Sequence, residues 1–319
     1  MNRPPALTAR PSVTPGAAAV VPAADRGAGG SLAGVDGRRL LEVRGTLQVA
    51  AEHVVYARPA LFEGLHTHRA FGFDVVEPGQ VRRRKIPGGT VKIVFALDGT
   101  VDGVRRDPAG LVVGMYDRGT TATHEGRMWS AQLQLGPLAA RRLLGVPLSE
   151  FRNTTLDAGD LFGRSARGLA ERLAETPTWD GRFALIAAYL RDHSAHADSD
   201  PVVAAAVRRL HTTRGSVPIA DLAADAGWSR RHFSRRFADQ VGLSPKSYAA
   251  LSRFTAALTL LTRADETHTP DLARIADTLG YYDQSHLTRD FRRFAGTTPG
   301  HLVRSDMSHS SKTASPPHP

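Results

Sequence analysis

Two segments in the last third of the chain combine the side chains that hydrogen-bond best to the edges of DNA bases. Each has an apolar face at helical spacing and an opposite face of Arg, Gln, Ser and Thr. Arg pairs with guanine, Gln pairs with adenine, and Ser and Thr adapt to either base. The candidate DNA contacts are Ser229, Arg230, Arg231, Ser234 and Arg235 in the first segment, and Gln284, Ser285, Thr288 and Arg289 in the second.

The two segments belong to two copies of one motif. The copies align at an offset of 53 residues, which becomes 54 after one insertion: 221–229 with 274–282, and 237–245 with 291–299. Each copy has a glycine after each of its two expected helices: Gly227 and Gly242, then Gly280 and Gly296. Glycine adopts the left-handed conformation that ends a helix. The duplication predicts two helix-turn-helix units, at 219–242 and 272–296.

Each unit needs a helix start and a connection to the other. Ser229 and Asp283 are placed to cap the second helix of their units. Between the copies, one helix is expected over 245–262. Its inner side would carry Tyr248, Leu251, Phe254, Leu258 and Leu261. At 1.5 Å per residue this helix would span roughly 27 Å, close to the ~34 Å repeat of B-DNA. Two recognition helices at that separation could enter successive major grooves.

This duplicated motif resembles the DNA-binding domain of the AraC/XylS-type transcription regulators, in which a linker helix joins two helix-turn-helix units. The resemblance covers 217–304, and its most diagnostic part is GYYDQSHLTRDFRRFAGTTP at 280–299. It implies base contacts by Arg231, Ser234 and Arg235, and base or phosphate contacts by Gln284, Ser285, Thr288 and Arg289. Arg292 and Arg293 lie further along the same helix. Tyr282 departs from the family, where this position is commonly small and polar.

The charge of the chain agrees with a polyanionic partner without identifying one. The chain has 319 residues, 41 Lys and Arg against 31 Asp and Glu, and a net charge of +10. Residues 201–304 hold 15 basic and 9 acidic residues, but within 217–304 the basic count falls to 12. A solvated basic surface would give similar totals. The argument for DNA therefore depends on where the arginines point.

The N-terminal half is predicted to be mostly β-structure. Short apolar runs separated by turn-forming residues are typical of a sandwich or small barrel. The expected strands include 47–51, 71–76, 90–97 and 111–116, and the expected turns are Pro78-Gly79, Pro87-Gly88-Gly89 and Asp98-Gly99. After residue 136 the apolar period becomes helical. It predicts helices over 137–144, 158–176, 180–197 and 201–214.

The fold class that follows is α+β: a β-rich N-terminal sensor-like domain with a helical connector, then an all-α domain of two helix-turn-helix units joined by a linker helix. The predicted divisions are a disordered tail at 1–35, a regulatory or dimerisation domain at 36–200, a DNA-binding domain at 201–305 and a disordered tail at 306–319. Pieces at 85–95, 143–147 and 161–163 resemble an uncharacterised sensor-like domain found ahead of this module in some actinobacterial-type members. That resemblance implies regulation or dimerisation and names no effector.

Several other classes have little support. The chain has no cysteine, which excludes disulfides, Cys-based zinc sites and a Cys nucleophile. We find no Ser/His/Asp arrangement, HExxH or phosphate loop, and no segment that approaches the roughly 18–20 apolar residues of a membrane span. For a metal site at His66 and His68, Asp74 and Glu77 are poorly placed as further ligands, although His124 is available, so ordinary surface or pocket histidines are favoured. The run 82–85 (RRRK) could bind an anionic effector, but a solvated turn or edge strand is favoured. We expect no catalytic residues, no cofactor, no metal and no membrane partner.

The sequence thus predicts a sequence-specific DNA-binding transcription regulator that is not an enzyme and acts in the cytoplasm, associated with the nucleoid. Its expected partner is double-stranded promoter DNA, with RNA polymerase, a homodimer and an unknown small-molecule effector as further candidates. Two alternatives stay open. One is an enzyme with an accessory DNA-binding module, of which the DNA-repair methyltransferases are an example, although their acceptor cysteine is missing here. The other is a ligand-free regulator whose N-terminal half only dimerises.

Overall fold

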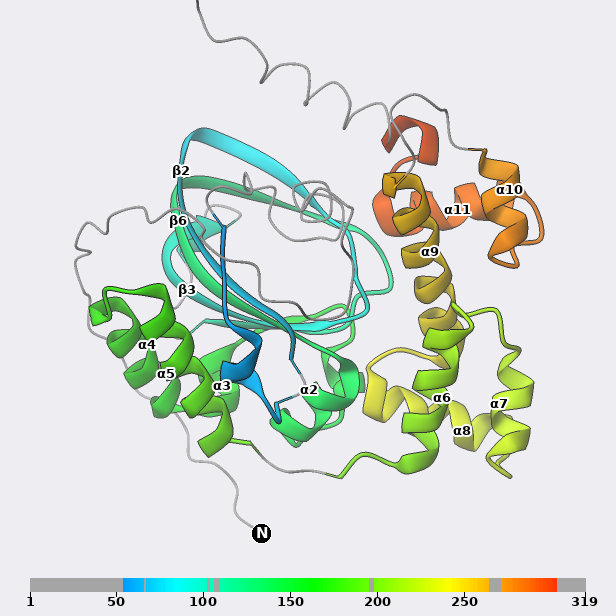
Figure 1. The fold of residues 1–319 in the computed structure, drawn as a ribbon, viewed down its shortest axis with the longest axis horizontal. Helices are drawn as coiled ribbons and strands as arrows, with labels where there is room; N and C mark the ends of the chain where they lie inside the picture. The colour runs from blue at the N-terminus through cyan, green and yellow to red at the C-terminus, as the bar shows by residue number, and fades with distance from the viewer. Residues whose placement is uncertain are drawn as a thin grey trace, which may run out of the picture.

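One curved antiparallel sheet dominates the N-terminal half of the computed structural model (Figure 1). The structure describes residues 54–65, 67–101, 104–105, 110–194, 198–263 and 271–302. The strands are β1 (Val54–Tyr56), β2 (Thr67–Lys85), β3 (Val91–Val101), β4 (Val104–Arg105), β5 (Leu111–Val113), β6 (Thr120–Leu135) and β7 (Thr155–Asp157). They pair in the order β1-β2-β6-β3-β5-β7, with β4 on β3. The predicted β-rich half is therefore confirmed, as one sheet.

Two of the expected turns are wrong. β2 runs through Pro78-Gly79 and β3 runs through Asp98-Gly99, with a register shift at each place. A bulge absorbs extra residues without ending a strand, and it tolerates a proline that cannot donate to the ladder. The third expected turn, at 87–89, does separate β2 from β3. The strand expected at 47–51 lies outside the described residues.

The strand expected at 111–116 ends earlier, at Val113. The next residue, Gly114, lies directly against the backbone of Phe151. A methyl group added to Gly114 would lie 1.9 Å from the Phe151 backbone oxygen. The segment from Gly114 to Gly119 therefore leaves the sheet and forms the connection to β6, which we call the 114–119 loop.

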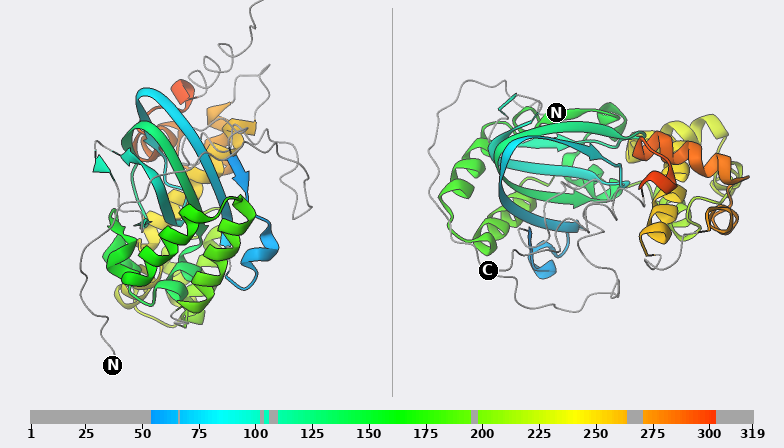
Figure 2. Two further views of the ribbon diagram at one scale, coloured as in Figure 1. Left: turned by 90° about the vertical axis from the view of Figure 1, so that its left-hand side faces the viewer. Right: turned by 90° about the horizontal axis from the view of Figure 1, so that it is seen from above.

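Helices cover one face of the sheet (Figure 2). They are η2 (Pro59–Phe62), α2 (Pro137–Leu144), η3 (Leu148–Phe151), α3 (Ala158–Phe162), α4 (Arg164–Glu175) and α5 (Trp179–Asp192). Ile93, Phe95 and Leu133 of the sheet are fully buried beneath them. The single helix expected over 158–176 is wrong, because Gly163 takes a φ of 63° and ψ of −147° between α3 and α4.

The C-terminal half is entirely helical where the structure describes it. Its helices are α6 (Pro201–Thr212), α7 (Ile219–Asp225), α8 (Arg230–Val241), α9 (Pro245–Arg263), α10 (Leu272–Thr278) and α11 (Gln284–Ala295). The pairs α7–α8 and α10–α11 form the two helix-turn-helix units. The predicted α+β class is confirmed. Asp200 and Ser244 stand directly before α6 and α9, and the side chain of each accepts a bond from an N–H group of the helix that follows it.

The linker helix α9 anchors both units through aromatic contacts. The ring of Tyr248 lies 5.8 Å from that of Phe237 in α8, and the ring of Phe254 lies 4.9 Å from that of Phe291 in α11. The predicted inner side of α9 is buried: Tyr248, Leu251, Phe254, Leu258 and Leu261. Buried aromatic pairs of this kind contribute about 0.5–1.5 kcal/mol each beyond their buried area. α9 therefore holds the two second helices in a fixed relation.

Candidate nucleic-acid interface

The second helix of the first unit, α8, carries the first set of candidate DNA contacts. It is capped by Ser229, whose hydroxyl accepts a bond from the His232 N–H at 3.2 Å. An N-cap of this kind stabilises a helix by about 1 kcal/mol. Phe233 and Phe237 are fully buried and attach α8 to the domain. The other face is open to solvent: Arg230, Arg231 and Arg235 are exposed and Ser234 is half-buried.

Two further side chains of α8 have structural roles. Arg236 pairs with Asp200 at 3.0 Å, and the other oxygen of Asp200 caps α6. His232 packs edge-on against Trp228, with ring centres 4.7 Å apart. Arg236 therefore joins α8 to α6, and the exposed arginines of α8 outside this ion pair are Arg230, Arg231 and Arg235.

The second recognition helix, α11, is built in the same way. Asp283 caps it by accepting the His286 N–H at 2.6 Å, and Leu287, Phe291 and Phe294 are fully buried. Its open face presents Gln284, Ser285, Thr288 and Arg289. The Thr288 hydroxyl donates to the Gln284 backbone oxygen at 2.9 Å, so its lone pairs face outward as acceptors.

The acidic residue within α11 does not lie on its open face. This residue, Asp290, is buried on the side facing the core. Burial raises the pKa of its carboxyl group, although the positive charges of His286, Arg253 and Arg293 oppose the shift. Two cationic helix faces, each led by a helix N-terminus, are therefore available to a polyanion.

A hollow of about 400 Å³ lies beside α8. Its walls carry Arg230, Ser234 and Lys246, together with the start of α7 at 218–220. The rest of the lining is apolar, so only the ends of Arg230, Ser234, Ser244 and Lys246 offer polar groups to a phosphate. Lys246 is a candidate contact that the sequence analysis did not name, and its position at the start of α9, directly after Ser244 and Pro245, was the available signal.

Tyr282 stands in the turn of the second unit, directly before the Asp283 cap. It is 93% exposed, the most exposed large hydrophobic side chain among the described residues. Trp228, Tyr248, Phe254 and Tyr281 differ from it, because they pack into the helical core as the sequence indicated. Tyr282 is thus the aromatic side chain of this domain that is free to meet a partner.

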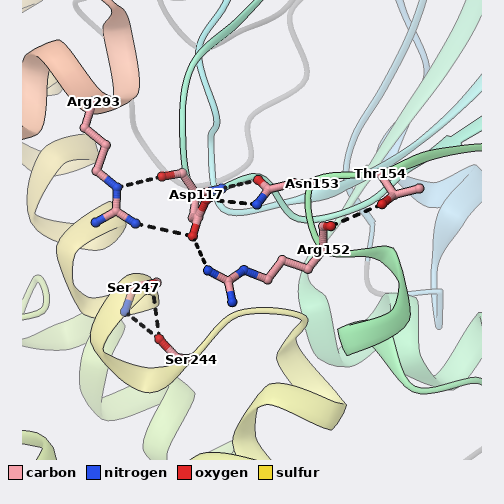
Figure 3. Close-up of polar contacts among 7 residues, drawn as sticks. All are labelled: Asp117, Arg152, Asn153, Thr154, Ser244, Ser247 and Arg293. Atoms are coloured by element: carbon pink, nitrogen blue, oxygen red, sulfur yellow. Dashed lines mark hydrogen bonds and ion pairs between the residues drawn. The ribbon is translucent and has the colours of Figure 1, made fainter.

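Arg293 does not join the open face of α11. Its Nε donates to the Asp117 backbone oxygen at 2.8 Å, and its Nη2 lies 3.3 Å from the Asp117 carboxylate (Figure 3). Asp117 belongs to the 114–119 loop of the N-terminal half. Arg293 therefore connects the two halves of the chain, while its neighbour Arg292 remains exposed.

The basic run at 82–85 is only partly solvated, which corrects the sequence expectation. Arg82 and Arg84 are exposed, but Arg83 is buried and pairs with Glu77. Within the part of the chain that the structure describes, no group of three His, Asp or Glu side chains is arranged to hold a metal ion. His66, one of the two histidines considered for such a site, lies outside that part.

Comparison with known proteins assigns the two halves separately. Residues 222–305 match the family model described as a helix-turn-helix domain, and residues 70–157 match a domain of unknown function, DUF6597. An AraC-like transcription regulator of Streptomyces lividans is 38% identical over 103 residues, which are 32% of this chain and 33% of the relative. A second, from Streptomyces antibioticus, is 38% identical over 110 residues, 34% of this chain and 35% of the relative. The chain thus spans about a third of the length of the curated relatives it matches.

Solved structures give more distant similarities. The C-terminal domain of AraT, a response regulator from Geobacillus stearothermophilus, is 20% identical with a TM-score of 0.31, covering 34% of this chain and 88% of that one. An apo ToxT variant from Vibrio cholerae is 11% identical with a TM-score of 0.42, covering 73% of this chain and 96% of that one.

Residues 222–305 are therefore a helix-turn-helix domain. In sequence this part of the chain is similar to AraC-like transcription regulators, as the duplicated motif indicated. A separate finding concerns membranes: among the described residues, no helix combines the length and the apolar character needed to cross one.

Proposed function

We propose that the protein is a sequence-specific transcription regulator that binds double-stranded promoter DNA with α8 and α11 in successive major grooves. One observation carries the proposal: both helices expose a base-reading face while α9 holds their buried faces. At 19 residues, α9 is roughly 28 Å long, near the ~34 Å repeat of B-DNA.

The side chains divide by their chemistry. Arg231, Arg235, Gln284 and Arg289 are long enough to reach base edges from exposed helix positions, and Ser234 and Thr288 adapt to their neighbours. The remaining contacts are better suited to phosphates, because they lie at helix starts or beside the hollow: Ser229, Arg230, Lys246 and Ser285.

The N-terminal half would modulate DNA binding, through a small molecule or through dimerisation. Its contact with α11 at Arg293 supports such a role, since a change in one half reaches the other directly. The relatives are named as regulators, which favours this class over an enzyme with an accessory module. The protein would then act at the nucleoid, with RNA polymerase as a candidate partner.

Selection of bound genomic fragments by the full chain, followed by fluorescence anisotropy on the enriched sequence, tests the proposal. Arg235→Ala and Arg289→Ala should each weaken specific binding by about 1–3 kcal/mol and relax the base preference. Arg172→Ala, at an exposed arginine of α4, is the matched control and should bind normally. Undiminished selective binding by the double variant would show that these helices do not read the DNA.

A further inference from the structure

A cavity of about 200 Å³ lies in the N-terminal half, at the end of β5. Lys92, Val113 and Thr155 are register partners on β3, β5 and β7, so their side chains point to the same side of the sheet, and all three line the cavity. The intervening residues Ile93 and Val112 are fully buried in the core on the other side. The cavity therefore opens on the face of the sheet opposite the main core.

The lining of this cavity is cationic. Among the residues that the structure describes, it includes Lys85, Lys92 and Arg118 and no Asp or Glu side chain. Hydroxyl groups add neutral donors, among them Thr120 and Tyr116, whose hydroxyl lies 3.1 Å from that of Thr155. Ammonium, guanidinium and hydroxyl donors around one space form the charge-assisted hydrogen bonds that carboxylates and phosphates accept. The chemistry thus selects an anion.

The volume limits the size of that anion. Liquid water occupies about 30 Å³ per molecule, so a cavity of about 200 Å³ holds roughly seven groups of that size. A phosphate ion or a short dicarboxylate fits this space, whereas a polymer such as DNA does not.

The 114–119 loop forms one wall of the cavity and also contacts the C-terminal half. Its even-numbered residues line the cavity, and two of its odd-numbered residues contact α11. Gly114, Tyr116 and Arg118 line the cavity. Asp117 binds Arg293, and the Gly119 N–H donates to the Arg293 backbone oxygen at 2.9 Å. The short 114–119 loop therefore separates the cavity from the end of α11.

The loop also reaches the end of α8. A methyl group added to Gly242, the residue that ends α8, would lie 3.1 Å from the Met115 side chain. Nearby, the Ser149 hydroxyl donates to the Asp239 carboxylate at 3.1 Å. The loop thus touches the C-terminal ends of both recognition helices, and a shift of the loop would alter how the two helices are held.

We propose that this cavity binds a small organic oxyanion, carrying a carboxylate or phosphate group, and that binding moves the 114–119 loop against α8 and α11. The occupied cavity then changes the affinity for DNA, and by linkage DNA changes the affinity for the anion by the same factor. The coupling of anion binding to DNA affinity rests on the proposed function, whereas the binding of an anion in the cavity does not.

Isothermal titration calorimetry on the full chain without DNA tests the site itself. The probes are inorganic phosphate, succinate and the neutral analogue succinamide. We expect one phosphate or succinate per chain and no binding of succinamide, with affinity at least about tenfold weaker in Lys92→Met. Arg118→Gln changes an exposed position, so it keeps the test valid if Lys92→Met fails to fold. Arg172→Ala should bind as the wild type does.

Equal binding of succinamide, unchanged affinity in Arg118→Gln, or no binding of either anion at 10-fold molar excess over millimolar protein would overturn the site. Anisotropy on the selected DNA then tests the coupling. The anion that binds should change DNA affinity by about fivefold or more, and Asp117→Ala should reduce that change while leaving anion binding intact. If a bound anion leaves the DNA affinity unchanged, the proposed coupling is wrong, but the anion site still stands. A protein that binds the anion but no DNA contradicts the proposed function instead.

Discussion

Arg293 of α11 binds both the carboxylate and the backbone oxygen of Asp117, a residue 176 positions earlier in the chain. The Asp117 carboxylate also accepts bonds from Arg152 at 2.6 Å and from Asn153 at 3.0 Å. Its side chain is only 8% exposed. One buried acid therefore joins the β5–β6 connection, the segment after η3 and the second recognition helix.

Asp117→Asn should destabilise the protein, because two arginines would lose their shared acceptor charge. Both arginines are partly exposed, at 48% and 40%, so water compensates in part and we expect a loss of about 1–3 kcal/mol. Urea unfolding of the full chain measures it. Asp180→Asn removes an exposed acid paired with Arg58 and should change stability by less than about 1 kcal/mol.

The same contact predicts a pH dependence. Burial opposes the ionisation of Asp117, but the bonds from Arg152 and Asn153 and the charges of Arg152 and Arg293 outweigh it and hold its pKa below the usual value. A lowered pKa stabilises the folded state above the ordinary Asp value of about 3.9, and this stabilisation is lost as the pH falls below it. The stability difference between wild type and Asp117→Asn should be constant from pH 5 to 8 and should shrink below about pH 4. A difference that shrinks near pH 7 would contradict the assignment.

Lys92 should lower the stability of the protein at neutral pH. Its burial, with the positive charge of Lys85 added, lowers its pKa from 10.5 to about 8. The unfolded chain then holds the proton more tightly, so the free energy of unfolding rises as the pH increases from about 8 towards 10.5. Arg118 and Tyr116 face the same cavity. Lys92→Met should therefore raise the melting temperature at pH 7 and remove part of this increase, as differential scanning calorimetry across pH would show.

Tyr282→Ala should weaken DNA binding without destabilising the fold. The side chain is almost fully exposed, so we expect a change in stability within about 0.5 kcal/mol. A phosphate contact by its hydroxyl would contribute about 0.5–1.5 kcal/mol, to specific and non-specific DNA alike. Anisotropy with both kinds of duplex measures it, and Tyr282→Phe isolates the hydroxyl. If Tyr282→Ala binds both duplexes as tightly as the wild type does, Tyr282 does not contact the DNA.

Gly119→Ala should weaken the contact between the two halves. The added methyl group would lie 2.5 Å from the backbone oxygen of Phe294, so the loop or α11 must move. Such overpacking typically costs about 1–3 kcal/mol. Gly79→Ala is the control, because nothing lies within 4 Å of its added methyl group. Faster hydrogen exchange at the end of α11 in Gly119→Ala, and not in Gly79→Ala, is the expected result.

The features that the sequence predicted well depend on neighbours within one helical turn. The caps at Ser229 and Asp283 and the glycine stops at Gly242 and Gly296 follow from local backbone chemistry, and the structure has all four. The buried stripe of α9 follows from helical spacing in the same way. The sequence therefore predicted the positions of α8 and α11.

The features that it missed depend on distant partners. Arg293 looks like its neighbours on an arginine-rich helix until the fold brings Asp117 beside it, and Arg236 needs Asp200, 36 positions away. Pro78-Gly79 is a typical turn pair, yet the pairing of β2 with β6 continues past it. Arg83 became buried for the same reason, since its strand is held by β6 on a long ladder.

The aromatic contacts of α9 have a consequence for the operator. Tyr248 and Phe254 lie six positions apart on one rigid helix and attach α8 and α11. The orientations of α8 and α11 about the axis of a bound duplex would therefore be fixed relative to each other. DNA turns once in about 10.5 base pairs. In the proposed complex a single chain would therefore engage half-sites on one side of the duplex and at one spacing, because α9 fixes the distance between α8 and α11 as well as their phase.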